Sequence, residues 1–164
     1  DATGSHLISS TYVGSPTASD GIMGLALDSK GQATVVGWTN ATSFPTTVGA
    51  LDRTDHPYTD GFVVRINSSA TALVYSTYLG GSGIDSPTAV AVDASGSAFV
   101  TGYTSSPDFP ITPGAAQTRI AGDVDAFLVK LSPTGNSLAY STVLGGSGTD
   151  RAFGARNRSR CFGA

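Results

Sequence analysis

Hydrophobic and polar positions alternate over short runs in this chain, and Gly, Pro, Asn or Asp interrupts each run. In residues 21–39 two apolar runs flank the turn Asp28-Ser29-Lys30-Gly31, and in residues 88–104 two further runs flank Asp93-Ala94-Ser95-Gly96. Asp often opens a tight turn, and Gly tolerates the positive φ that such a turn requires. Each segment is therefore predicted to be an antiparallel β-hairpin.

A second hairpin is predicted after each of these segments. Residues 60–81 contain two apolar runs around Asn67-Ser68-Ser69, and residues 125–146 contain two runs around Pro133-Thr134-Gly135-Asn136. Pro-rich connections of roughly twenty residues join the first hairpin to the second, which is longer than most loops. We expect each connection to be an ordered surface excursion anchored by a buried Phe, either Phe44 or Phe109.

The pattern repeats along the chain with a shift of 65 positions. The landmarks that return include the turn residues Asp28 and Asp93, the Phe-Pro pairs, and the segments YSTYLGGSG and YSTVLGGSG. Each period contains four strands as two hairpins, which is what one blade of a β-propeller requires. We therefore predict an all-β fold of four-stranded antiparallel blades, with two full repeats and partial strands at both ends. The predicted units are an N-terminal outer strand and insertion (1–20), two blade repeats (21–83 and 84–148), and the start of a further blade with an Arg-rich tail (149–164).

The repeated motifs resemble those of the SBBP repeats, a bacterial β-propeller family that is similar in architecture to NHL-type propellers. The likeness rests on AVAVDASGSAFVTGYTSSPDFPITPGA, on DAFLVKLSPTGNSLAYSTVLGGSGTD and on their earlier copies, and it covers about residues 7 to 153. The resemblance implies propeller blades on secreted or surface proteins. It implies no established catalytic activity and no active-site motif.

Composition and charge narrow the function classes. The chain has 164 residues, no Glu, two Lys and a net charge of −3, so it offers no basic surface for nucleic acid. No apolar run reaches the length of a membrane-spanning helix, and membrane insertion is not expected. Cys161 is the single cysteine, which excludes an internal disulfide.

The two ends depart from a complete blade pattern. SSTYVG stands where the fourth strand of a preceding blade is expected, so Ser9, Ser10, Thr11, Tyr12 and Val13 form a candidate inter-chain strand. After Asp150 the chain reads RAFGARNRSRCFGA, with Arg156 and Arg158 near positions where an apolar run and a turn Asp are expected. Either end strands pair between chains, in a ring or filament, or the missing blades belong to a longer polypeptide.

The chemistry-bearing residues have simple structural interpretations. The repeated aspartates, namely Asp28/Asp93, Asp60/Asp125 and Asp85/Asp150, are expected to cap turns rather than to bind calcium. His6 and His56 are isolated and are expected to be solvated loop residues. Trp38 and Tyr103 share one repeat position and are expected to pack, with a sugar-stacking platform as the alternative. Asn40, Asn67 and Asn157 lie in glycosylation triplets.

The sequence favours a bacterial protein, secreted or at the cell surface, that acts as a non-catalytic binding or structural module. The alternative is a self-assembling subunit, and a glycan-acting enzyme is the weaker third hypothesis. Other copies of the chain or further blades are the expected partners, with surface glycan as a further candidate. No cofactor, metal or catalytic residue is expected.

Overall fold

The computed structural model describes residues 1–156, and these contain eight strands and no helix. The strands form two four-stranded antiparallel sheets, each in sequence order. Sheet 1 contains β1 (Asp20–Leu27), β2 (Ala33–Thr39), β3 (Asp60–Ile66) and β4 (Leu73–Leu79). Sheet 2 contains β5 (Asp85–Val92), β6 (Ala98–Thr104), β7 (Asp125–Leu131) and β8 (Leu138–Leu144). The predicted all-β fold with two four-stranded blades is confirmed.

The first hairpin of each sheet closes as its turn residues predict. The Asp28 carboxylate accepts hydrogen bonds from the backbone N–H groups of Lys30 and Gln32, both at 2.8 Å, and Gly31 has a φ of +74°. In sheet 2, the Asp93 carboxylate accepts the equivalent bonds at the equivalent turn, and Gly96 has a φ of +89°. The carboxylate accepts hydrogen bonds from turn N–H groups that have no partner in the strand ladder. Gly adopts the positive φ of the turn without the steric clash that a Cβ would cause.

The long connections are ordered by their aromatic residues. Phe44 is buried and stacks on Phe62 of β3 with ring centroids 4.6 Å apart, and Phe109 stacks on Phe127 of β7 at 4.7 Å. The Tyr78 hydroxyl also accepts a bond from the N–H of Phe44. The expected anchoring by buried Phe is confirmed.

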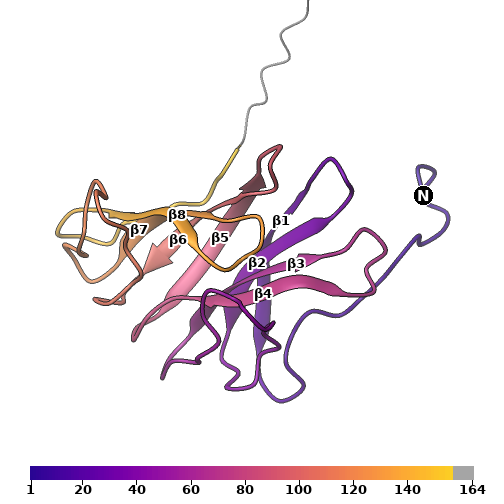
Figure 1. Ribbon diagram of the computed structural model, residues 1–164. Coiled ribbons are helices and arrows are strands. Elements are labelled where there is room, and N and C mark those ends of the chain that lie inside the picture. The colour runs from indigo at the N-terminus through magenta and orange to yellow at the C-terminus, as the bar shows by residue number, and fades with distance from the viewer. Residues whose placement is uncertain (157–164) are drawn as a thin grey trace, which may run out of the picture.

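The two sheets stand side by side like adjacent blades (Figure 1). β5, the first strand of sheet 2, packs against β1, β2 and β3 of sheet 1. The backbones of β1 and β5 approach closely at Gly24, where an added Cβ would lie 3.2 Å from the Cα of Ala89. A continuous apolar core fills the space between the sheets. Its members include Val36, Val63, Tyr75, Leu79, Val90, Val100, Phe109, Phe127, Val129 and Leu131.

The predicted partial strands at the two ends are not formed within the described residues. Ser9–Val13 have no ladder partner and lie in irregular backbone, because a strand needs a neighbour for its N–H and C=O groups. Residues 149–156 make only an isolated parallel bridge, between Thr149 and Val124. Asn157 and the rest of the predicted tail lie outside the described residues. Within the part described, no helix is long and apolar enough to cross a membrane.

Candidate functional site

Each four-stranded sheet has two faces. Within the molecule, one face of sheet 1 packs against one face of sheet 2. We call the face of sheet 1 that carries Val36, Val63, Tyr75 and Leu79 a receiving face, because sheet 2 is seated on it. We call the opposing face of sheet 2, which carries Val90, Val100, Val129 and Leu131, an inserting face. All eight of these side chains are buried. This internal interface is the reference for each kind of face in its covered state.

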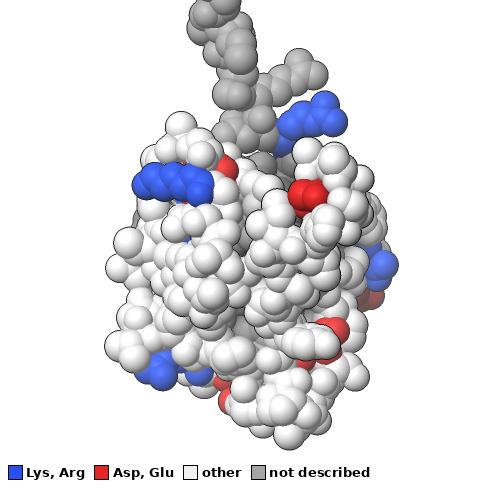
Figure 2. All heavy atoms as spheres, turned by 90° about the vertical axis from the view of Figure 1, so that its right-hand side faces the viewer, with Lys and Arg blue, Asp and Glu red and all other residues white. Residues whose placement is uncertain are grey.

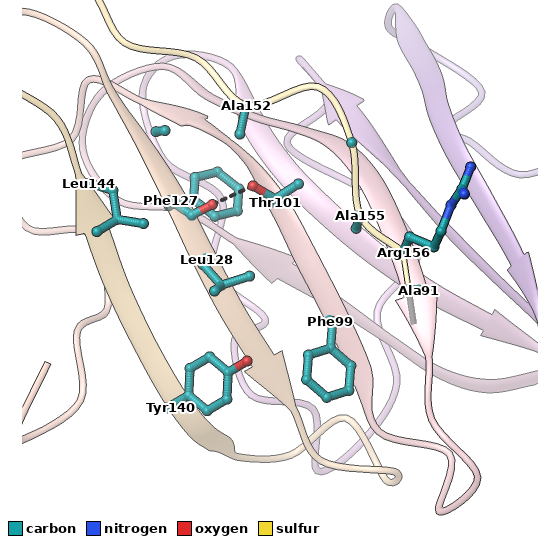
Figure 3. A pocket seen from close by; sticks show the side chains of 12 residues that line it. Ala91, Phe99, Thr101, Phe127, Leu128, Tyr140, Leu144, Ala152, Ala155 and Arg156 are labelled. Carbon is teal, nitrogen blue, oxygen red and sulfur yellow. Dashed lines mark hydrogen bonds between the residues drawn. The ribbon is translucent and has the colours of Figure 1, made fainter. Parts of the chain in front are cut away.

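The receiving face of sheet 2 is open. Its residues at the same repeat positions are Thr101, Leu128, Tyr140 and Leu144. Tyr140 is 37% exposed and Leu144 is 46% exposed, whereas their counterparts in sheet 1 are each 1% exposed. These side chains line a hollow of about 350 Å³ together with Phe99. Figure 3 shows Leu128 and Tyr140 beside Phe99, with the chain from Ala152 to Arg156 passing over the strands.

The inserting face of sheet 1 is open along β1, whereas its β2 and β3 side chains Val35, Val64 and Ile66 are buried. Leu25 and Leu27 of β1 are 60% and 64% exposed, although Val90 at the position of Leu25 is 7% exposed in sheet 2. Residues 11–14 lie beside the β3 and β4 residues of this face and border a hollow of about 200 Å³ with them. Charged groups are few and scattered on this side of the molecule (Figure 2). The apolar character of the face comes from Leu25, Leu27 and the buried cluster of Val35, Val64 and Ile66.

Residues 149–156 lie on sheet 2 in the place that β5 has on sheet 1. The N–H of Asp150 donates to the carbonyl of Val124 at 2.8 Å, which repeats the bond from Asp85 to Thr59 at 2.8 Å. The Thr88 hydroxyl donates to the carbonyl of Ala152. This segment, which we call the C-terminal strap, covers only the part of the receiving face nearest β5 and β6.

The candidate inter-chain strand lies on sheet 1 in the place that β4 has on sheet 2. The N–H of Ser15 donates to the Asp20 carboxylate at 2.6 Å, as the N–H of Gly81 donates to Asp85 at 2.8 Å. Val13 packs against the apolar cluster of the inserting face, while Ser9, Ser10, Thr11 and Tyr12 are exposed. The structure thus places these five residues at the edge of the open face. Their pairing with another chain stays a prediction.

A buried basic residue ties the two sheets together. Arg65 of β3 is 3% exposed, pairs with Asp28, and donates to the carbonyl of Gly96 in sheet 2. Burial acts to raise the pKa of Asp28, but hydrogen bonds from Gln32 and Lys30 and the Arg65 guanidinium outweigh it and lower the pKa. Between the sheets, burial raises the pKa of Tyr75 to about 12. The internal interface is therefore mainly apolar, and Arg65 adds a buried polar link to it, beside the hydrogen bond from the Leu51 N–H to the Gly135 carbonyl at 2.9 Å.

The equivalent ion pair of sheet 2, between Lys130 and Asp93, is partly exposed to solvent. Lys130, at the position of Arg65, lies 3.1 Å from the Asp93 carboxylate and 4.7 Å from the centre of the Phe99 ring. Burial opposes the shift, but bonds from Ser95 and Lys130 lower the pKa of Asp93 to about 2. The Lys130 side chain is 27% exposed. Its charge therefore stands at the border of the open face.

The repeated aspartates cap turns, as predicted. Asp85 and Asp150 each accept a hydrogen bond from a Gly N–H four residues earlier, and Asp125 accepts one from Ala121. Burial raises the pKa values of Asp60 and Asp85. Among the described residues, no group of three His, Cys, Asp or Glu side chains could hold a metal ion.

The expectation for His56 is wrong. Its ring Nδ1 lies 3.0 Å from the buried Asp60 carboxylate, and its side chain is only 24% exposed, because the loop folds back over Asp60. His6 is 83% exposed, as expected for a solvated residue.

The remaining candidates are spread over loops. Asn40 accepts a bond from the Thr59 hydroxyl, and Asn67 caps its turn through the N–H of Thr71. Glycosylation at both stays a prediction, and Asn157 lies outside the described residues. Trp38 and Tyr103 border one shallow hollow. The sugar-stacking alternative at these two residues stays open.

Sequence reasoning did not identify the receiving face of sheet 2. Leu128, Tyr140 and Leu144 occupy repeat positions that are apolar in both copies, which predicts burial for both. The incomplete set of blades indicates that two blades alone would leave faces exposed, but the repeat does not indicate which side chains these faces carry.

Residues 74–110 match a family model described as the SBBP beta-propeller repeat. The matched segment begins in β4, runs through β5 and β6, and ends at Phe109 and Pro110. It therefore joins the outer strand of one blade to the inner hairpin of the next. No curated protein matches the chain. The repeat match and the two four-stranded sheets together show that this chain carries an SBBP-type β-propeller repeat.

Proposed function

We propose that this protein is a secreted or cell-surface module that binds other proteins through its open blade faces and has no catalytic role. The observation that carries the proposal is the receiving face of sheet 2. It repeats most positions of the face that binds sheet 2 within the molecule, with Phe99 and Thr101 in place of Thr34 and Val36, and the C-terminal strap covers only part of it. A surface built on the same positions as an established interface is suited to the same kind of contact.

The chemistry of this face supports protein binding. Phe99, Tyr140 and Leu144 form an apolar hollow with Lys130 at its border. Exposed apolar patches with polar rims mark interaction sites, and aromatic residues in pockets contribute much of the binding energy at such sites. The expected ligand is therefore an apolar β-sheet surface rather than a small polar molecule.

The acidic residues support a non-catalytic role. Asp28, Asp85, Asp93 and Asp125 are held by backbone N–H groups in turns, which leaves their carboxylates committed to the fold. Extracellular location is supported by the scarcity of Lys and by a single Cys in a chain dense in Ser, Thr and Gly. The location is tested by treating intact producing cells with protease, which should remove the protein if it is displayed outside.

The binding role is tested with producing cells that have been stripped of the protein. The purified wild-type chain, Leu128→Asp and the control Val48→Asp are added back, and the retained protein is measured. Val48 is 91% exposed in a loop outside both faces. The proposal predicts retention of the wild type and Val48→Asp but not of Leu128→Asp. Equal retention of all three chains, or no retention of any, would contradict it.

A further inference from the structure

We propose that the partner of the open faces is a second copy of this chain. The inserting face of sheet 1 in one copy would cover the receiving face of sheet 2 in the next, head to tail. This inference rests on the proposed function and names the partner of the same site. The two faces are different, so the contact is heterologous and builds either a ring or an open filament.

The inserting faces of the two sheets are close equivalents. Both are built from aliphatic residues at the same repeat positions, and in sheet 2 those residues already fill a receiving face. The equivalent pairs are Leu25/Val90, Val35/Val100, Val64/Val129 and Ile66/Leu131. Val35, Val64 and Ile66 are 3%, 1% and 6% exposed in one copy, and residues 11–14 lie against this face. Sheet 1 of a second copy would therefore present nearly the shape of sheet 2 once residues 11–14 are displaced.

The receiving faces correspond at three apolar positions, although Phe99 and Thr101 of sheet 2 replace Thr34 and Val36 of sheet 1. Leu128, Tyr140 and Leu144 stand where Val63, Tyr75 and Leu79 stand in sheet 1. The basic group is kept as well, since Lys130 replaces Arg65. In the internal interface Arg65 donates to the carbonyl of Gly96 in the neighbouring blade. Lys130 would face the carbonyl of Gly31 in a second copy, because Gly31 is the repeat equivalent of Gly96.

The C-terminal strap and the incoming β1 require the same place on sheet 2. The strap is held by the bonds of Asp150 to Val124, of Ala152 to Gly102 and of Thr88 to Ala152. A four-stranded sheet buries far more apolar surface than this short segment, so an incoming blade can displace it. Weakening the strap should therefore favour assembly.

Besides the larger Phe99 in place of Thr34, a further position fits the second interface less well than the first. Gly135 lies under Tyr75, and a Cβ added there would lie 2.4 Å from the tyrosine ring. Its equivalent in sheet 1 is Ala70, which has a φ of +57° and a Cβ that Tyr140 of another copy would meet. The association between copies should therefore be weaker than the internal interface, and Ala70→Gly should strengthen it.

The test is sedimentation velocity of the purified full chain over a wide range of concentration. The wild type should associate as concentration rises. Leu128→Asp removes the receiving face and Leu25→Asp removes the inserting face, so each should raise the dissociation constant by about 30-fold or more. A mixture of these two variants keeps one intact face of each kind, and it should form a dimer of one copy of each that does not grow further.

Two further variants should act in the opposite direction, with Val48→Asp as the matched control. Ala70→Gly should tighten association by about fivefold, because overpacking against Tyr140 is relieved. Thr88→Val removes the hydrogen bond from Thr88 to the strap, so it should also tighten the association between copies. A monomeric wild type at all concentrations, association that survives both aspartate substitutions, or a mixture that yields no dimer would overturn the inference. Circular dichroism and thermal midpoints verify that each variant is folded.

The outcome is separable from that of the proposed function. If the purified chain stays monomeric while cells retain the wild type but not Leu128→Asp, the face binds another protein and the second copy is excluded. If Leu128→Asp changes neither retention nor association, both proposals fail.

Discussion

The two blades of this protein carry the same pattern of side chains, yet one receiving face is core and the other is surface. Val63 and Leu128 occupy one repeat position, as do Leu79 and Leu144. Val63 and Leu79 are buried under sheet 2, whereas Leu144 is 46% exposed. The difference does not come from the residues themselves. It comes from whether a neighbouring blade is present.

Whether a side chain is buried in a repeat protein depends on the neighbouring repeat as much as on the sequence of its own repeat. Each repeat buries apolar surface by stacking, so equivalent positions contribute to stability only where a neighbouring repeat covers them. The consequences can be measured by making the same change in both blades.

The largest difference is expected for a charge placed at the shared position of Val63 and Leu128. Val63→Asp puts a carboxylate between the sheets and should lower the free energy of unfolding by about 4 kcal/mol or more. Leu128→Asp should change it by only about 1 kcal/mol, because the carboxylate reaches water. Urea denaturation of the two variants measures both values, and similar costs would refute the asymmetry between the blades.

The basic link gives the next largest contrast. Arg65→Ala removes a buried cation and leaves Asp28 without its partner, at a cost of about 3 kcal/mol. Lys130→Ala removes a partly exposed cation and should cost about 0.5 kcal/mol. Thermal unfolding of both variants at low and high salt distinguishes them, since only the Lys130 contribution should be sensitive to salt. An equal loss in the two variants would mean that Arg65 is not buried in the interface.

The turn residue under Tyr75 is Gly135, and its repeat equivalent in sheet 1 is Ala70. Exchanging Gly and Ala at these two positions should change stability in opposite senses. Gly135→Ala adds a Cβ against Tyr75 at a residue with a φ of +70°, and it should destabilise the protein by about 2 kcal/mol. Ala70→Gly removes a Cβ from a left-handed residue and should stabilise the monomer by up to about 1 kcal/mol. The two unfolding free energies should therefore move in opposite senses.

The smallest contrast concerns pH. Burial raises the pKa of Asp85 in the folded state above its unfolded value, so its contribution is most favourable at low pH and is lost as pH rises through the folded pKa. Asp85→Asn removes this pH dependence. The thermal midpoint of the variant minus that of the wild type should therefore be more positive at neutral pH than at acid pH. Asp150→Asn, at the same repeat position with partial exposure, is the control and should change little. Thermal midpoints from pH 3 to pH 8 make the comparison.

Much of the fold could be predicted from the sequence because the signals are local. Asp28 and Gly31 set one turn, and the same pair returns at Asp93 and Gly96, so the hairpins and the blade repeat follow from neighbouring residues. Phe44 and Phe109 likewise identify the anchors of the long connections. These features depend on residues within one period.

The candidate site depends on contacts between periods, which explains why less of it could be predicted. Tyr75 and Tyr140 lie in nearly identical segments, YSTYLGG and YSTVLGG, so no local signal separates a buried ring from an exposed one. Val13 was expected in a strand, and a further strand was expected after Asp150, but within the described residues the first has no ladder partner and the second is reduced to the bridge between Thr149 and Val124. His56 was expected in solvent because its contact with Asp60 depends on the path of the loop.

The most direct test of the account is the solvent exposure of equivalent methyl groups. Methyl NMR with a soluble paramagnetic probe, recorded on dilute monomeric protein, reports which Leu and Val side chains solvent reaches. The account predicts strong relaxation enhancement at Leu144 and Leu25, an intermediate enhancement at the half-buried Leu128, and little at their repeat counterparts Leu79, Val90 and Val63. Equal enhancement within these pairs would contradict the claim that one protein presents the same blade faces both covered and open.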